Sequence, residues 1–179
     1  PVITGAQLNT EAEKVIKDNL KRVDREDILK RVFKIEKNMK NILYAPTWRK
    51  DSEAELFPFT DFNEKEIENF LEDNKINIFL RVHPDFETEI DEKLLKIKGI
   101  YVLNSKVVKD ISEYLSCFDL LITDYSSIFI DYLLLDKPIL FLPYDFEKYD
   151  KEIGFTVNYM THTPGPKSYS FENFKNEIM

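Results

Sequence analysis

Short apolar runs, separated by segments with helical spacing, dominate the chain from residue 41 onward. The five runs lie near residues 41–45, 76–82, 100–103, 118–123 and 138–142, and each is continuous rather than alternating. Continuous apolar runs are typical of strands that are buried on both faces of a parallel sheet. The pattern therefore predicts one α/β domain with a doubly wound, Rossmann-like parallel sheet, covering residues 1–179.

Helices are predicted in the segments between these strands. Two helical patterns occupy much of residues 1–40, and the pattern 126–135 indicates a helix within the last βαβ unit. The others run from a cap at Asn63 through Leu71, over 87–98 with a cap near Asp85 and an end at Gly99, over 110–117, and from about Phe171.

The segment 118–142 contains the first candidate site. An apolar run leads into the polar sequence DYSS at 124–127, and an apolar segment follows in which Asp131 is the only charge. We interpret this as strand, turn, helix and strand, with a right-handed crossover. Free backbone N–H groups and the helix dipole favour an anion at such a turn. We therefore expect Ser126 and Ser127 to hold phosphate.

Polar side chains also follow two other strands. Thr47 and Arg49 come after the first strand, and Arg81 and His83 flank the end of the second. Ligands of open α/β sheets bind at the carboxyl ends of the strands. The planar fork of Arg49 suits phosphate, and His83 could donate to a phosphate or act as acid or base near neutral pH.

Structural explanations of the same residues stay open. The loop with Trp48 could simply cover the core, and a lone histidine such as His83 is more often structural. Ser127 could act only as a helix cap, and Asp131 could meet only solvent or a nearby lysine. The single cysteine, Cys117, is interpreted as a small buried residue.

Composition narrows the function classes. The 179 residues carry a formal net charge of −8, which argues against nucleic-acid binding, because a basic stripe would be expected. One cysteine excludes an internal disulfide and suits a reducing compartment. No GxGxxG, GxxxxGK[ST], GxSxG, CxxC or HExxH pattern occurs, so we expect no zinc or other metal site. The chain begins at PVITG without Met, which favours a fragment of a longer protein.

Five motifs carry a family resemblance, in order: YAPTWR at 44–49, RVHP at 81–84, ITDYSSIFIDYLLLDKPILF at 122–141, YDFEKYDKEIGF from Tyr144, and PGP at 164–166. Together they closely resemble the CDP-glycerol:poly(glycerophosphate) glycerophosphotransferases, which are teichoic acid primases and polymerases. The opening ITG is also similar to the entry to that family's C-terminal domain. One departure is QLN at 7–9, where the family often has Pro-Arg-Asn.

The resemblance implies a GT-B architecture, with two Rossmann-like domains facing a cleft. This chain resembles only the second, donor-binding domain, and the family's N-terminal domain would supply a histidine base. The implied reaction transfers glycerol phosphate, or a related polyol phosphate, from a CDP-linked donor to a hydroxyl on a lipid-linked or glycan acceptor. CMP would leave, no cofactor is implied, and the whole enzyme would sit peripherally on the inner face of the cell membrane.

The resemblance and the pattern together suggest roles for the candidate residues. Ser126 and Ser127 are assigned to the donor phosphates, with His83 and Arg81 beside them and His83 as the catalytic candidate. Asp131, one helical turn after Ser127, could reach the ribose. Thr47 and Arg49 would face the cleft. The alternatives are a GT-B glycosyltransferase that uses a nucleotide sugar, and a nucleotide-binding domain without catalysis.

Overall fold

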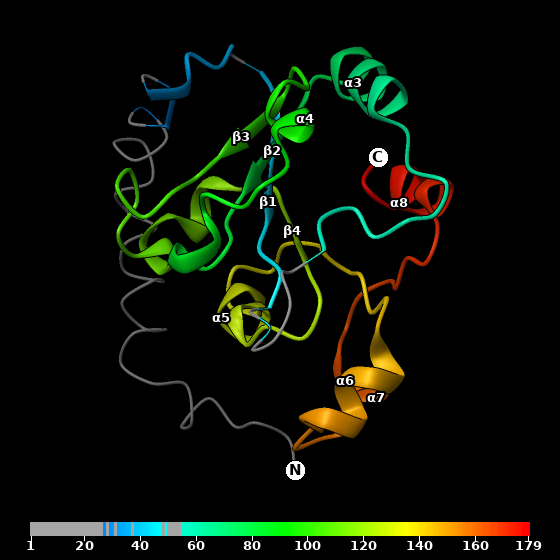
Figure 1. Ribbon diagram of the computed structural model, residues 1–179. Coiled ribbons are helices and arrows are strands. Elements are labelled where there is room, and N and C mark those ends of the chain that lie inside the picture. Colours follow the sequence, from blue (N-terminus) through cyan, green and yellow to red (C-terminus); the bar gives the residue numbers. More distant parts are fainter. Residues whose placement is uncertain (1–26, 28, 31, 37, 48, 50–54) are drawn as a thin grey trace.

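The computed structural model describes residues 27, 29–30, 32–36, 38–47, 49 and 55–179. In this part of the chain five strands form one sheet in the order β3-β2-β1-β4-β5, and every pairing is parallel. The strands are β1 (Lys40–Tyr44), β2 (Ile76–Leu80), β3 (Ile100–Val102), β4 (Leu120–Thr123) and β5 (Ile139–Phe141). All five coincide with predicted runs, so the predicted doubly wound fold is confirmed (Figure 1).

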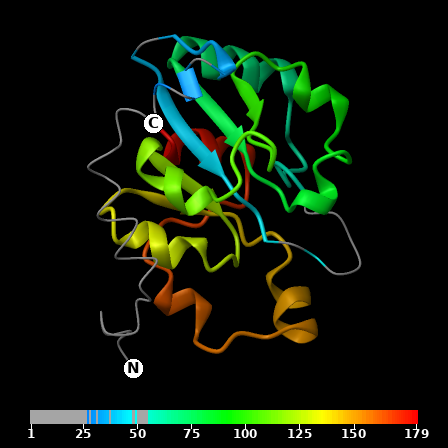
Figure 2. The ribbon, with the colours of Figure 1, turned by 90° about the vertical axis from the view of Figure 1, so that its left-hand side faces the viewer.

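Helices cover both faces of the sheet. Alternate strand residues pack on opposite sides, with Ile42 and Ile78 in one core cluster and Leu43 and Phe79 in the other. The first cluster includes side chains of α3 (Glu64–Asp73), α4 (Glu92–Leu95) and α8 (Phe171–Glu177), and α8 lies behind the sheet in Figure 2. The second includes side chains of η4 (Ile111–Cys117), α5 (Ile128–Leu133) and α7 (Tyr159–His162). Burial on both sides explains why the strand sequences do not alternate.

The carboxyl ends of the strands meet at one edge of the sheet. β1 points toward the lower half of Figure 1, where α5 and α6 (Phe146–Glu152) lie. The backbone hydrogen bonds continue beyond the strands, since Arg81 N donates to Tyr44 O at 2.8 Å and Ala45 N donates to Ile122 O at 2.9 Å. The loops that leave this edge therefore start from well-fixed positions.

The amphipathic helix predicted over 87–98 is wrong for most of its length. A 3₁₀ turn, η3 (Pro84–Phe86), follows β2, and the α-helical part of this segment is the four-residue α4, capped by Asp91. Glu87 is held instead by the loop after β3, where its carboxylate accepts from Ser105 N at 2.6 Å and from the Ser105 hydroxyl at 3.2 Å. This long-range contact outweighs local helix propensity.

Several predicted helix boundaries are confirmed. Asn63 caps α3 by accepting from Glu66 N at 2.9 Å. Gly99 has the predicted left-handed φ of +93°, but α4 already ends at Leu95, so Gly99 lies in the turn before β3 and does not end a helix. Ser170 caps α8 by accepting from Asn173 N at 3.2 Å. The predicted helix over 110–117 is the 3₁₀ helix η4, and Cys117, at its end, is buried as expected. The first of the two helical patterns in residues 1–40 lies outside the described residues, whereas in the second pattern the described residues 27, 29–30 and 32–33 are helical, as predicted.

Helix α5 is shorter than the predicted 126–135. It ends at Leu133, and the next three amides, of Leu134, Leu135 and Asp136, bond three residues back instead of four. Asp136 then takes a φ of +51°, which turns the chain toward β5. The helical segment is therefore a compact connection between β4 and β5.

The PGP turn at 164–166 lies against β5. Phe141 N donates to Pro166 O at 3.0 Å, and Ser168 N donates to Phe141 O at 2.9 Å. A Cβ on Gly165 would lie 2.1 Å from Ile139 O, so this close approach of two backbones requires glycine. The turn thus extends the edge of the sheet with an extended segment.

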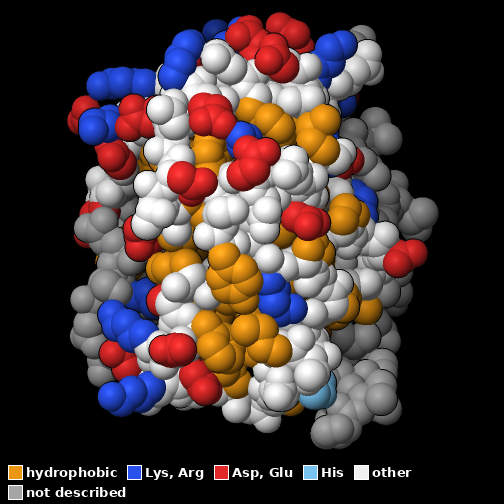
Figure 3. All heavy atoms as spheres, turned by 90° about the vertical axis from the view of Figure 1, so that its right-hand side faces the viewer, with side chains coloured by type: hydrophobic (Ala, Val, Ile, Leu, Met, Phe, Trp, Pro, Cys, Tyr) orange, Lys and Arg blue, Asp and Glu red, His pale blue; other side chains and the backbone are white. Residues whose placement is uncertain are grey.

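Charged side chains of both signs are intermingled on the face shown in Figure 3, and hydrophobic side chains gather in its lower half. The exposed large hydrophobic residues include Ile153, Val157, Met160 and Tyr169, which come from the C-terminal third of the chain. Within the described residues, none of the helices has the length and apolar character needed to cross a bilayer.

Candidate functional site

The candidate site lies where the strand order changes direction. From β1 the chain winds outward to β2 and β3, and from β4 it winds the other way to β5. The loops after β1 and β4 therefore leave the same edge side by side, at the topological switch point where open α/β sheets bind ligands. Thr47 of the first loop donates its backbone N–H to Asp124 of the second at 2.7 Å. This brings together residues that are 77 positions apart in the sequence.

Ser126 and Ser127 occupy the turn after β4. Ser127 is exposed and stands at the N-cap position of α5, but its side chain makes no capping hydrogen bond and its backbone is already helical, with φ −61° and ψ −11°. Within the described residues, neither serine hydroxyl has a hydrogen-bond partner. The explanation of Ser127 as only a helix cap therefore lacks its expected contact.

Asp131 lies within α5, one helical turn after Ser127, and is half-buried. The structure thus places it on the helix that follows the serine turn, as predicted from the spacing. Its assignment to a ribose stays a prediction.

Arg49 and Asp124 are buried beneath this edge, with 6% and 2% of their surfaces exposed. The guanidinium donates from Nη2 to Asp124 at 2.9 Å, and from Nε and Nη2 to the two carboxylate oxygens of Asp145 at 3.1 Å. Burial by itself lowers the pKa of Arg49, but the hydrogen bonds to Asp145 and the charge of Asp124 outweigh it and raise this pKa above its usual value. Arg49 is therefore a permanent cation held by two carboxylates.

Three tyrosine rings surround the Arg49 guanidinium. The centroids of Tyr125, Tyr144 and Tyr149 lie 5.2, 5.7 and 5.0 Å from its central carbon. Burial is the main cause of a raised pKa for all three phenols, so each stays neutral near pH 7. The hydroxyl oxygen of Tyr125 is buried without a hydrogen-bond partner among the described residues. The rings shield the ion network from water on its sides.

Arg81 and His83 lie at the end of β2 but do not share one environment. Arg81 Nη1 donates to Leu103 O at 2.8 Å and lies 3.9 Å from Glu87, and burial lowers its pKa. It therefore links the loops after β2 and β3. His83 is more open, with 46% of its side chain exposed, and its Nδ1 lies 3.4 Å from Asp85 N. Of the two, His83 is the more available to a ligand.

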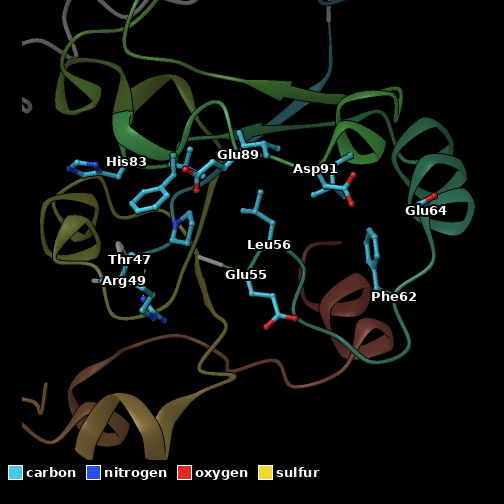
Figure 4. Close-up of a pocket in the computed structure, with 14 residues that line it drawn as sticks. Thr47, Arg49, Glu55, Leu56, Phe62, Glu64, His83, Glu89 and Asp91 are labelled. Carbon is cyan, nitrogen blue, oxygen red and sulfur yellow. Dashed lines mark hydrogen bonds between the residues drawn. The ribbon is translucent and has the colours of Figure 1, made fainter. Parts of the chain in front are cut away.

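A cavity of about 450 Å³ opens between the loops after β1 and β2. Figure 4 shows Thr47, Arg49 and His83 toward one end and Phe62 and Glu64 toward the other. The wall between them is apolar, but the rim carries acidic side chains that include Glu55, Glu89 and Asp91. Acidic groups disfavour a phosphate in this cavity, so the serine turn is the better candidate for the anion. No group of three His, Cys, Asp or Glu side chains that could hold a metal ion occurs among the described residues.

Comparison with known proteins decides the family. The family model of CDP-glycerol:poly(glycerophosphate) glycerophosphotransferases matches residues 16–179. The chain belongs to this family. A teichoic acid glycerol-phosphate primase of Bacillus subtilis is 36% identical over 145 residues, which cover 78% of this chain and 35% of that protein. A teichoic acid glycerol-phosphate transferase of Staphylococcus aureus is 35% identical, covering 82% of this chain and 38% of its own length. The chain thus spans little more than a third of the length of each of these two relatives.

Solved structures agree with the fold of this chain. A wall teichoic acid polymerase TagF variant superposes with a TM-score of 0.72 at 28% identity, over 94% of this chain and 40% of that one. A TagF variant soaked with CDPG gives a TM-score of 0.65 at 30% identity, over 87% of this chain and 37% of that one. A UDP-GlcNAc 2-epimerase of Methanocaldococcus jannaschii, 14% identical with a TM-score of 0.51 over 95% of this chain and 45% of that one, shares the fold alone.

Sequence reasoning missed part of the candidate site. Asp124 and Asp145 were not chosen as functional residues, although each directly follows or closely follows a predicted strand, which is the signal that could have found them. Their partner Arg49 is 75 and 96 residues away in the sequence, so no local sequence pattern predicts that the three side chains interact. Trp48, named as a possible cover of the core, lies outside the described residues.

Proposed function

We propose that the protein carrying this chain transfers a polyol phosphate from a CDP-linked donor to an acceptor hydroxyl, with release of CMP. This chain would bind the donor. The observation that carries the proposal is the serine turn at the switch point of the sheet, in a chain that belongs to the glycerophosphotransferase family. Ser126 and Ser127 present hydroxyl groups there that no described residue uses.

The proposed reaction is an in-line displacement at phosphorus. The acceptor oxygen forms a bond to the β-phosphorus of the donor, and the bond from that phosphorus to the bridging oxygen breaks, so that CMP leaves with the electron pair. Negative charge then grows on the bridging and α-phosphate oxygens, and preorganised donors lower its energy. We assign this task to the Ser126 and Ser127 hydroxyls and to His83, and the ribose hydroxyls to Asp131.

The proton of the acceptor hydroxyl needs a base, which we place outside this chain. We propose that a further domain of the same enzyme lies over the carboxyl edge and supplies this base, since the chain spans little more than a third of the length of the two teichoic acid relatives described above. The acceptor would be a lipid-linked or polymeric glycerophosphate or glycan chain, and the enzyme would work peripherally at the inner face of the membrane. His83, which is half exposed, would then face the cleft.

Ribitol phosphate is a second candidate for the transferred group. A teichoic acid poly(ribitol-phosphate) polymerase of Bacillus spizizenii is 33% identical over 131 residues, which cover 73% of this chain and 21% of that protein. Relatives named for both polyols therefore match the same region.

Measuring CMP release tests the proposal. The complete protein should release CMP from CDP-glycerol or CDP-ribitol when given an acceptor, and a UDP-sugar should not replace either donor. Residues 1–179 alone should bind cytidine diphosphate weakly and catalyse no transfer, because the base is absent. Transfer from a UDP-sugar alone would support a glycosyltransferase instead, and clear CMP release by residues 1–179 would refute the assignment of the base to another domain.

A further inference from the structure

The ion network under the serine turn joins three loops of the carboxyl edge. Arg49 follows β1, Asp124 follows β4 and Asp145 follows β5. Arg49 also donates from Nη1 to Thr47 O at 2.8 Å. The protein thus has partners for four of the five N–H groups that a guanidinium offers.

This arrangement leaves Arg49 poorly placed to hold a substrate phosphate. A phosphate with a bidentate grip needs two parallel N–H groups, and the pair formed by Nε and Nη2 already holds Asp145. Separating a buried ion pair leaves an uncompensated charge, which is strongly unfavourable. The network also carries one cation and two carboxylates, so releasing Asp145 would place a negative charge beside an anionic ligand.

Asp124 connects the network to the serine turn. Its Oδ2 holds Arg49, and its Oδ1 accepts from Thr47 N at 2.7 Å, from the Thr47 hydroxyl and from Tyr125 N at 2.6 Å. Its backbone oxygen accepts from the Tyr159 hydroxyl at 2.9 Å. The position and direction of the chain entering the turn are therefore set by this one residue, three positions before Ser127.

We propose that Arg49 and Asp124 are positioning residues that set the serine turn for the donor phosphates, and that Arg49 does not itself contact phosphate. This inference rests on the proposed function. It replaces the direct phosphate contact that the sequence suggested for Arg49. Thr47 acts in the same way, because its hydroxyl and its N–H both hold Asp124.

The variant Asp124→Asn distinguishes a direct phosphate contact of Arg49 from a positioning role, because the two predict opposite changes in donor affinity. If Arg49 contacted phosphate, Asp124→Asn would remove a competing negative charge and strengthen donor binding. If Asp124 positions the turn, the same change puts an amide N–H against either Arg49 or the N–H groups of Thr47 and Tyr125, and weakens donor binding by about tenfold or more. Calorimetric titration of the complete protein with CDP-glycerol and with CDP-ribitol measures the difference. Unchanged or tighter binding by Asp124→Asn overturns the proposal.

Two further variants keep the test decisive if Asp124→Asn does not fold. Thr47→Val removes a single hydrogen bond to Asp124 and leaves the ion network in place, so we expect about a 2- to 12-fold loss of donor affinity. Arg49→Lys is combined with Ser127→Ala in a double-mutant cycle. If Arg49 acts through the turn, Arg49→Lys costs much less affinity once Ser127 has been removed. Multiplicative losses would show independent contacts and overturn the proposal.

The unmodified protein distinguishes this failure from failure of the proposed function. If the unmodified protein binds neither CDP-polyol, the proposed function is wrong, and so is the proposal that Arg49 and Asp124 position the turn for donor phosphates. If it binds one of them and the variants behave as independent contacts, only the positioning role is wrong. Thermal unfolding of every variant, measured without ligand, excludes global unfolding as the cause of a lost affinity.

Discussion

Replacing the Ser127 hydroxyl tests the donor site most directly. Ser127→Ala removes one oxygen at the start of α5. In the structure this oxygen makes no capping hydrogen bond, so its removal should change the free energy of unfolding by less than about 0.5 kcal/mol. A hydrogen bond to a charged phosphate contributes roughly 1.5–3 kcal/mol, which corresponds to about a 10- to 150-fold loss of donor affinity.

A matched control is available in the same chain. Ser170 also stands at a helix N-cap, and its hydroxyl oxygen accepts from Asn173 N at 3.2 Å. Ser170→Ala should therefore lower the free energy of unfolding by about 1 kcal/mol and leave donor affinity unchanged. The two variants change the same chemical group, and only their surroundings differ.

The assay pairs thermal or chemical unfolding with calorimetric titration of CDP-glycerol and cytidine diphosphate. Ser127→Ala should bind the donor more weakly but unfold with nearly the same free energy. Ser170→Ala should unfold more easily but bind the donor with unchanged affinity. If Ser127→Ala instead lost about 1 kcal/mol of stability with its affinity intact, the serine would be a cap. The reasoning that assigns the turn to phosphate would then be refuted.

Three other outcomes follow from the packing and the charges. Gly165→Ala should destabilise the fold by about 2 kcal/mol or more in chemical denaturation, because its Cβ would meet Ile139 O at 2.1 Å; a neutral effect would contradict this. Tyr125→Phe should leave the unfolding free energy equal or higher by about 1 kcal/mol, since the lost oxygen is buried without a described partner, and a clear loss of stability would argue against this. Burial raises the phenol pKa values of Tyr125, Tyr144 and Tyr159, so the folded protein holds these protons more tightly than the unfolded chain. The free energy of unfolding should therefore be constant up to about pH 10 and decline above it. A series of denaturation measurements in which it stayed level across that range would contradict this.

The fold and most element boundaries could be predicted because they depend on local signals. Strand residues such as Leu43 and Phe79 are fully buried from both sides, and the sequence records this as continuous apolar runs. Asn63 and Ser170 mark helix starts through side-chain chemistry that acts within three residues. The helix predicted over 87–98 does not form around Glu87, whose carboxylate accepts a hydrogen bond from the N–H of the distant Ser105.

The candidate site was predicted only in part, for the same reason. The serine turn and His83 were expected because each follows an apolar run, and the carboxyl ends of parallel strands gather at one edge. The sequence by itself thus determined which segments form the sheet and which loops reach that edge. Only the tertiary structure decided that Arg49 meets Asp124 and Asp145 there, because the strand order, rather than any local pattern, brings loops 75 and 96 residues apart into hydrogen-bonding distance.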